Sequence, residues 1–148
     1  MFKKRTNSID YSHELETTAF GYEFYREILI PELLGSEQPA VLYWTGKEMA
    51  RQFPLSSREE IEEFFQRAGW GKLSLTQEKK NEATFDLQSD LITERKKTNR
   101  IGCYQLEAGF LAEQYQNMLH CIAEAYETDK KNDIQFTVKW DPKDQINK

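Results

Sequence analysis

Apolar residues recur at helical spacing over a long stretch that begins near Cys103 and continues to about Ile122. One side of the corresponding helix carries seven of them: Ala108, Leu111, Ala112, Tyr115, Met118, Leu119 and Ile122. A second side carries Leu106, Gly109 and Phe110. Two apolar sides indicate a central helix that packs on both. Because glycine weakens a helix by about 1 kcal/mol relative to alanine, Gly109 indicates close approach of another backbone.

Three further helices are predicted before this central one. Residues 15–34 form a helix that Pro31 should kink or restart, because proline lacks a backbone N–H. Residues 39–53 form a second helix, apolar nearly all round in its first turns. The third begins at Ser57, which together with Glu60 matches a capping-box pattern.

The apolar period changes from 3.6 to 2 after the third helix. Residues 72–88 alternate between apolar and polar around a polar turn, which predicts a β-hairpin. Ser89 is positioned to cap a short helix. After the central helix, residues 124–128 and the alternating strand 134–140 predict a second hairpin. The fold class is therefore α+β: an antiparallel sheet of two β-hairpins with helices packed on one side.

The 148 residues are predicted to form a single α+β domain over residues 13–141. Residues 1–12 are expected to be a flexible lead-in, and residues 142–148 a polar tail.

The amino-acid composition argues against nucleic-acid-binding, membrane-spanning and secreted classes of protein. The formal charge is −5, which argues against a general nucleic-acid-binding protein, for which a basic face would be the first sign. Apolar residues make up 39% of the chain, but no run approaches the length of a membrane span. The basic N-terminus is followed by no apolar segment, so we do not expect it to be a signal peptide. Two cysteines do not make a disulfide framework, so a cytoplasmic location is expected.

No catalytic constellation can be assembled from these residues, and we predict no enzymatic activity, no cofactor and no metal site. His13 and His120 have no second ligand at metal-binding spacing. Glu107 is interpreted as a favourable charge in the first turn of the central helix. Cys103 precedes that helix, and it is either a small, mostly buried residue or a reactive thiol.

One basic cluster, formed by Arg95, Lys96, Lys97 and Arg100, follows an acidic region. Its composition is typical of a solvated loop, and a contact to a phosphate group or a partner is the alternative. Both interpretations stay open at the level of sequence.

Three segments together resemble a known family: residues 42–51 (LYWTGKEMAR), 69–71 (GWG) and 105–114 (QLEAGFLAEQ). They are similar to the bacterial YslB-like family of uncharacterised proteins, and more remotely to four-vinyl-reductase domains and TRAPP vesicle-tethering subunits. The resemblance covers most of the chain. It implies an α+β fold with a two-hairpin sheet, frequent dimerisation, and a superfamily that tends to bind small or lipophilic ligands.

From this resemblance we predict a non-enzymatic binding or regulatory module that holds a lipophilic small molecule between the second helix, the central helix and the sheet. The side chains expected to line that site are Tyr43, Met49, Leu111, Tyr115 and Met118. The alternative is a homodimeric adaptor or structural protein with a filled core and no ligand. Residues Phe20, Phe24 and Ile28 of the first helix are the expected dimer contact.

Overall fold

Four strands form one antiparallel sheet in the order β1-β2-β4-β3 in the computed structural model, which describes residues 15–146. The strands are β1 (Lys72–Lys79), β2 (Glu82–Gln88), β3 (Cys121–Asp129) and β4 (Ile134–Gln145). Each hairpin joins consecutive strands, and the pairing of β2 with β4 joins the two hairpins. The predicted two-hairpin sheet is confirmed.

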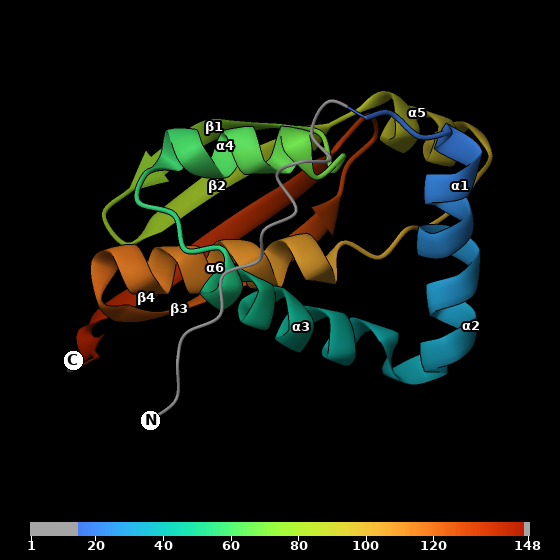
Figure 1. The fold of residues 1–148 in the computed structure, drawn as a ribbon. Coiled ribbons are helices and arrows are strands. Elements are labelled where there is room, and N and C mark those ends of the chain that lie inside the picture. Colours follow the sequence, from blue (N-terminus) through green and yellow to red (C-terminus); the bar gives the residue numbers. More distant parts are fainter. Residues whose placement is uncertain (1–14, 147–148) are drawn as a thin grey trace.

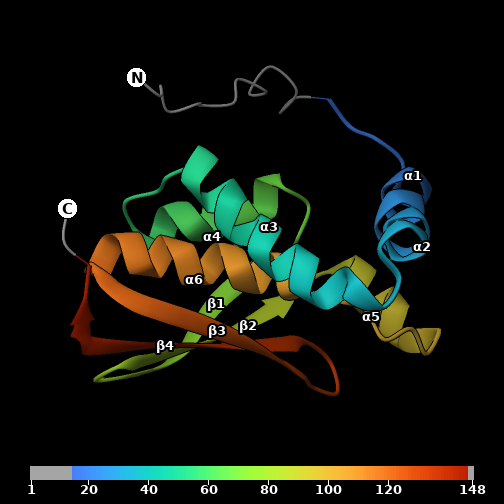
Figure 2. The ribbon, with the colours of Figure 1, turned by 90° about the horizontal axis from the view of Figure 1, so that it is seen from below.

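The helices lie on one side of this sheet (Figures 1 and 2). In chain order they are α1 (Ala19–Glu23), a π-helical segment (Phe24–Leu29), α2 (Ile30–Leu34), a 3-10 turn (Gly35–Glu37), α3 (Gln38–Gln52), α4 (Arg58–Arg67), α5 (Asp90–Lys97) and α6 (Gln105–Leu119). Figure 2 shows α6 above the sheet, with α3 and α4 on that same side. Helices α1 and α2 stand at one end of the domain (Figure 1).

The core lies between the sheet and α6. Alternation along the strands turns side chains such as Phe85, Phe136 and Val138 inward, where each is fully buried. Every residue from Glu107 to Tyr115 of α6 is buried. Helix α6 is therefore packed on both sides, as its two apolar stripes predict.

Helices α3 and α6 cross through a pair of glycines. A Cβ added at Gly109 would lie 2.0 Å from the carbonyl oxygen of Tyr43, and one added at Gly46 would lie 2.2 Å from that of Leu106. Neither position has room for a methyl group, so the predicted backbone contact at Gly109 is confirmed.

The central helix ends earlier than predicted, at Leu119 rather than Ile122. His120 adopts a left-handed conformation with φ 59°, and Cys121 begins β3. Pairing with β4 across the sheet overrides the helical spacing of Leu119 and Ile122, which local sequence alone could not reveal. His120 is thus the C-cap of α6 rather than a residue within the helix.

The C-terminal strand, the N-terminal segment and two helix caps were also predicted from the sequence. Strand β4 continues past Trp140 to Gln145, so it includes the first residues of the segment expected as a polar tail. The expected lead-in, residues 1–12, lies outside the described residues, as does His13. The predicted caps are confirmed, because Ser57 accepts a hydrogen bond from the N–H of Glu60 and Ser89 accepts one from that of Ile92.

Candidate functional site

A cavity of ≈ 220 Å³, here called the apolar chamber, lies where the N-terminal helices meet α3 and α6. Its wall is mostly aromatic and aliphatic. The lining residues are Tyr22, Tyr25, Arg26, Ile30, Gln38, Leu42, Trp70, Cys103 and Leu106. Side chains far apart in the sequence thus line one partly open pocket that no single helix could form.

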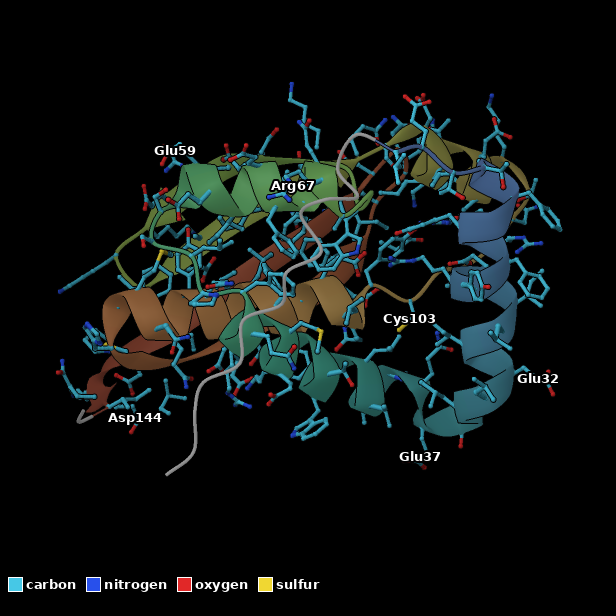
Figure 3. All side chains as sticks on the ribbon, in the orientation of Figure 1. Glu32, Glu37, Glu59, Arg67, Cys103 and Asp144 are labelled. Atoms are coloured by element: carbon cyan, nitrogen blue, oxygen red, sulfur yellow. The ribbon has the colours of Figure 1, made fainter. Side chains whose placement is uncertain are left out.

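A second cavity of ≈ 280 Å³, the polar chamber, adjoins the first because Gln38 and Cys103 line both. Its other lining residues are Glu27, Pro31, Arg100 and Ile101. Figure 3 shows Cys103 on the loop before α6, with its sulfur in the space between that loop, α3 and the N-terminal helices. The site therefore has an apolar end and a polar end.

The π-helical segment between α1 and α2 carries two of the chamber residues, Tyr25 and Arg26. The N–H of Ile30 bonds to the carbonyl of Tyr25, five residues earlier, in the wider π-type turn. Pro31 follows directly within the first turn of α2, where its missing N–H is tolerated. The predicted kink or restart at Pro31 is thus a restart that follows a widened turn, and such turns are frequent at functional sites.

A buried ion pair joins this segment to the central helix. Arg26 Nη2 lies 2.6 Å from Oε2 of Glu107, a side chain that is fully buried. Arg26 also donates to the Cys103 carbonyl oxygen at 3.1 Å and to the Tyr22 hydroxyl at 3.3 Å. Burial lowers the pKa of Arg26, but its interactions with Glu107 and the Tyr22 hydroxyl together outweigh burial, and the pKa lies above its ordinary value. Arg26 therefore stays charged, and its charge is matched.

Glu107 lies in the first turn of α6, as predicted, but its carboxylate is also removed from water and paired with Arg26. Removing either partner would leave an unmatched charge in the interior.

A second ion pair holds the other side of the N-terminal helices. Arg95 donates from Nε and Nη2 to the two carboxylate oxygens of Glu23, at 2.9 and 2.6 Å. Glu27 lies 3.7 Å from the Nε atoms of both Arg95 and Arg26. The solvated-loop interpretation is wrong for Arg95, which is buried on α5 and also donates to the Tyr104 hydroxyl.

Arg100 differs from these two arginines. It is exposed and lines the polar chamber, and among residues 15–146 its side chain has neither a hydrogen-bond partner nor an ion-pair partner. The solvated-loop interpretation fits this member of the basic cluster.

Cys103 is half-buried at the border of the two chambers. Burial raises the pKa of its thiol, while the backbone N–H of Gln105 acts in the opposite direction without cancelling the shift. The neutral thiol is thus favoured, which argues against the reactive-thiolate interpretation.

The five predicted ligand-binding residues do not line either of these two chambers. Leu111 and Tyr115 are buried in the core, and Met49 and Met118 pack against it. The hydroxyl of Tyr43 donates to Glu124 and accepts from the N–H of Ala125, which covers part of the free edge of β3. Ligand binding by these five stays a prediction.

Sequence reasoning missed the residues that do line the apolar chamber, above all Arg26 and Trp70. The available signal was Arg26, which lies among apolar residues of the first helix, together with Glu107 in the apolar central helix. Opposite charges on two apolar helices indicate a buried pair, but the partner is not specified by spacing.

The predicted dimer residues lie on an exposed apolar face of the N-terminal helices. Phe20, Phe24 and Ile28 are 76%, 39% and 48% exposed, and the rings of Phe20 and Phe24 stack. Dimerisation through this face stays a prediction.

The part of the chain that the structure describes shows neither a metal-binding cluster nor a membrane-spanning helix. Within residues 15–146, no three His, Cys, Asp or Glu side chains come together as a metal site. None of the helices in that same range is long and apolar enough to cross a membrane.

Comparison with known proteins gives three results. Residues 19–139 match the family described as protein of unknown function (DUF2507). The chain is 47% identical to the uncharacterized protein YslB of Bacillus subtilis (strain 168), over 99% of this chain and 100% of that protein. The crystal structure of a vinyl-4-reductase family protein from Methanocaldococcus jannaschii is similar with a TM-score of 0.61, at 17% identity, over 86% of this chain and 85% of the other.

The third likeness shows the α+β fold alone, because so low an identity carries no residue roles. The first two are stronger, since the matched segment runs from the start of α1 almost to the end of the alternating part of β4. The chain therefore belongs to the DUF2507 family.

Proposed function

We propose that this protein is a non-enzymatic binding module that holds a lipophilic small molecule in the apolar chamber. One observation carries the proposal: Ile30, Leu42 and Leu106 join aromatic side chains around a cavity whose one charged lining group, Arg26, is already paired with Glu107. Apolar pockets with few convergent polar groups are the usual sites of small-molecule binding.

The same geometry favours binding over catalysis. A group that transfers protons needs a pKa near the working pH, whereas Arg26 stays charged and the Cys103 thiol stays neutral. A cytoplasmic location fits both cysteines being free thiols.

The first test fills the chamber and measures ligand content. Leu42→Trp places a large side chain in the wall, and Val41→Trp is the matched control, since Val41 is the exposed neighbour on α3 and does not line the chamber. Protein purified from its own host is extracted with organic solvent and analysed by mass spectrometry.

We expect an enriched apolar molecule in the parent and in Val41→Trp, and its loss from Leu42→Trp at unchanged thermal stability. An empty parent, or equal recovery from both variants, would contradict the proposal.

A homodimeric adaptor is the second candidate, favoured by the exposed face of Phe20, Phe24 and Ile28. Stable interfaces usually bury more than about 1,000 Å² in total, and apolar residues at their centre contribute most. We expect a dimer by light scattering at micromolar concentration. Phe24→Glu should produce the monomer, while Trp44→Glu, at an exposed position on α3, should not. A monomeric parent would exclude this candidate.

A further inference from the structure

We infer that the ligand is an amphiphile whose anionic head group binds Arg100 in the polar chamber while its apolar part occupies the apolar chamber. This inference rests on the proposed function, since it names the chemical class of the molecule that the apolar chamber would hold.

Two neighbouring chambers with different linings form the site. The apolar chamber and the polar chamber share Gln38 and Cys103 and differ in every other lining residue. A molecule long enough to occupy both meets mostly aliphatic and aromatic side chains at one end, and at the other end Glu27 and Arg100 beside Pro31 and Ile101. That asymmetry matches an amphiphile rather than a uniformly apolar compound.

The positive charge of Arg100 favours an anionic head group. Arg26 and Arg95 have their own carboxylates at 2.6 Å, Glu107 and Glu23 respectively. Arg100 has no such carboxylate among residues 15–146, so it is the charged side chain of the polar chamber that is left to bind a ligand. A guanidinium is suited to carboxylates and phosphates because its N–H groups donate in a planar fork.

Glu27 also lines the polar chamber and would repel an anion if it stood alone. Its side chain is only 9% exposed and lies 3.7 Å from the Nε atoms of both Arg26 and Arg95, whose nearer carboxylates are Glu107 and Glu23. Arg100 is exposed, so of the two charged groups that line the polar chamber its guanidinium is the more accessible to a ligand from solvent.

Gln38 supplies a neutral donor between the two ends. Within the described residues its side-chain amide has no hydrogen-bond partner, although it lines both chambers. The amide can donate to a head-group oxygen at the point where the apolar part of the ligand begins.

The test compares four probes of equal chain length on the full chain: decanoate, decyl phosphate, decanol and decylamine. Binding is measured by calorimetry below the concentration at which each probe forms micelles. We expect decanoate or decyl phosphate, or both, to bind about tenfold more tightly than decanol, which is the scale of one charge-assisted hydrogen bond. The stronger of the two anions distinguishes a carboxylate from a phosphate head group.

Arg100→Gln removes the charge, and Lys97→Gln is the matched control because Lys97 is exposed on the same segment, pairs with Glu94, and lines neither chamber. We expect Arg100→Gln to lower anion affinity to that of decanol and to leave decanol affinity unchanged. Lys97→Gln should leave all affinities within about twofold, as expected for a screened surface charge.

Equal binding of decanol and the anions, with no effect of Arg100→Gln, would overturn this inference and leave the proposed function intact. Tighter binding of decylamine would overturn it as well, because Glu27 would then be the recognition group. If no probe binds and the extracted protein contains no enriched apolar molecule, both the inference and the proposed function are contradicted.

Discussion

Replacement of Gly109 by alanine is the sharpest test of how α3 and α6 pack. The added Cβ would lie 2.0 Å from the carbonyl oxygen of Tyr43, which falls short of the 3.4 Å of an ordinary contact by about 1.4 Å. The opposing atom belongs to a backbone, so no side-chain rotation can relieve the overlap. Helix α3 would have to move, and the hydrogen bonds of the Tyr43 hydroxyl to Glu124 and Ala125 resist that movement.

The magnitude follows from two opposed effects. Alanine is favoured over glycine within a helix by about 1 kcal/mol. Overpacking a core costs about 1–3 kcal/mol, and a forced backbone shift places Gly109→Ala at the upper end of that range. We therefore expect a net loss of about 2 kcal/mol in the free energy of unfolding, and a larger loss for Gly109→Leu. For a chain of this size the melting temperature would fall by about 4–8 °C.

Urea denaturation followed by circular dichroism measures the free energy, and a thermal melt provides the second readout. Gly21→Ala is the control, since Gly21 also lies in a helix but its added Cβ would meet a side-chain oxygen of Thr18 at 3.0 Å. We expect a change of less than about 0.5 kcal/mol there. A Gly109→Ala variant as stable as the parent would refute the backbone contact between the two helices.

Three further predictions concern buried polar groups. Arg26→Met or Glu107→Gln should each lower stability, by about 3–5 kcal/mol when an unmatched charge is left, and the double variant should recover much of the loss in urea denaturation. Tyr43→Phe should cost about 1 kcal/mol and speed hydrogen exchange at the Ala125 amide, because that N–H loses its acceptor. Burial raises the pKa of Tyr115 to about 12, so the folded state retains a proton that the unfolded state loses near pH 10. Stability should therefore fall as the pH rises from about 10 to 12, and Tyr115→Phe should flatten that dependence.

A different experimental outcome would contradict each of these three predictions. Additive losses in the Arg26 and Glu107 double variant would show that the two side chains do not interact. Unchanged exchange at Ala125 in Tyr43→Phe would mean that the hydroxyl does not protect the edge of β3. A pH dependence identical in Tyr115→Phe and the parent would assign the alkaline loss to other tyrosines.

Much of the fold could be predicted because the relevant signals are local. The change from period 3.6 to period 2 located the hairpins, and Ser57 and Ser89 marked two helix starts through hydrogen bonds spanning three residues. The end of α6 could not be predicted in this way. Ile122 fits the helical stripe as well as it fits a strand, and only its place in the strand paired with β4 decides between them.

The candidate site was least accessible to local reasoning. Tyr43, Leu111 and Tyr115 satisfied the criteria for a lining residue, yet they pack in the core or cover the edge of the sheet. The chambers instead form where the N-terminal helices approach Trp70 and the loop at Cys103. The placement of whole helices determines which apolar side chains fill the core and which line a pocket.

The sequence by itself determined the fold class, the two-stripe character of the central helix and the close contact at Gly109, because periodicity and glycine carry that information within one element. Only the tertiary structure decided the environment of polar residues on that helix. Glu107 and Glu113 are buried because Arg26 and Arg51 reach them from other helices, and such pairings follow from chain placement rather than from spacing. A charge can be buried when a distant partner compensates it, and the partner is known only once the chain has folded.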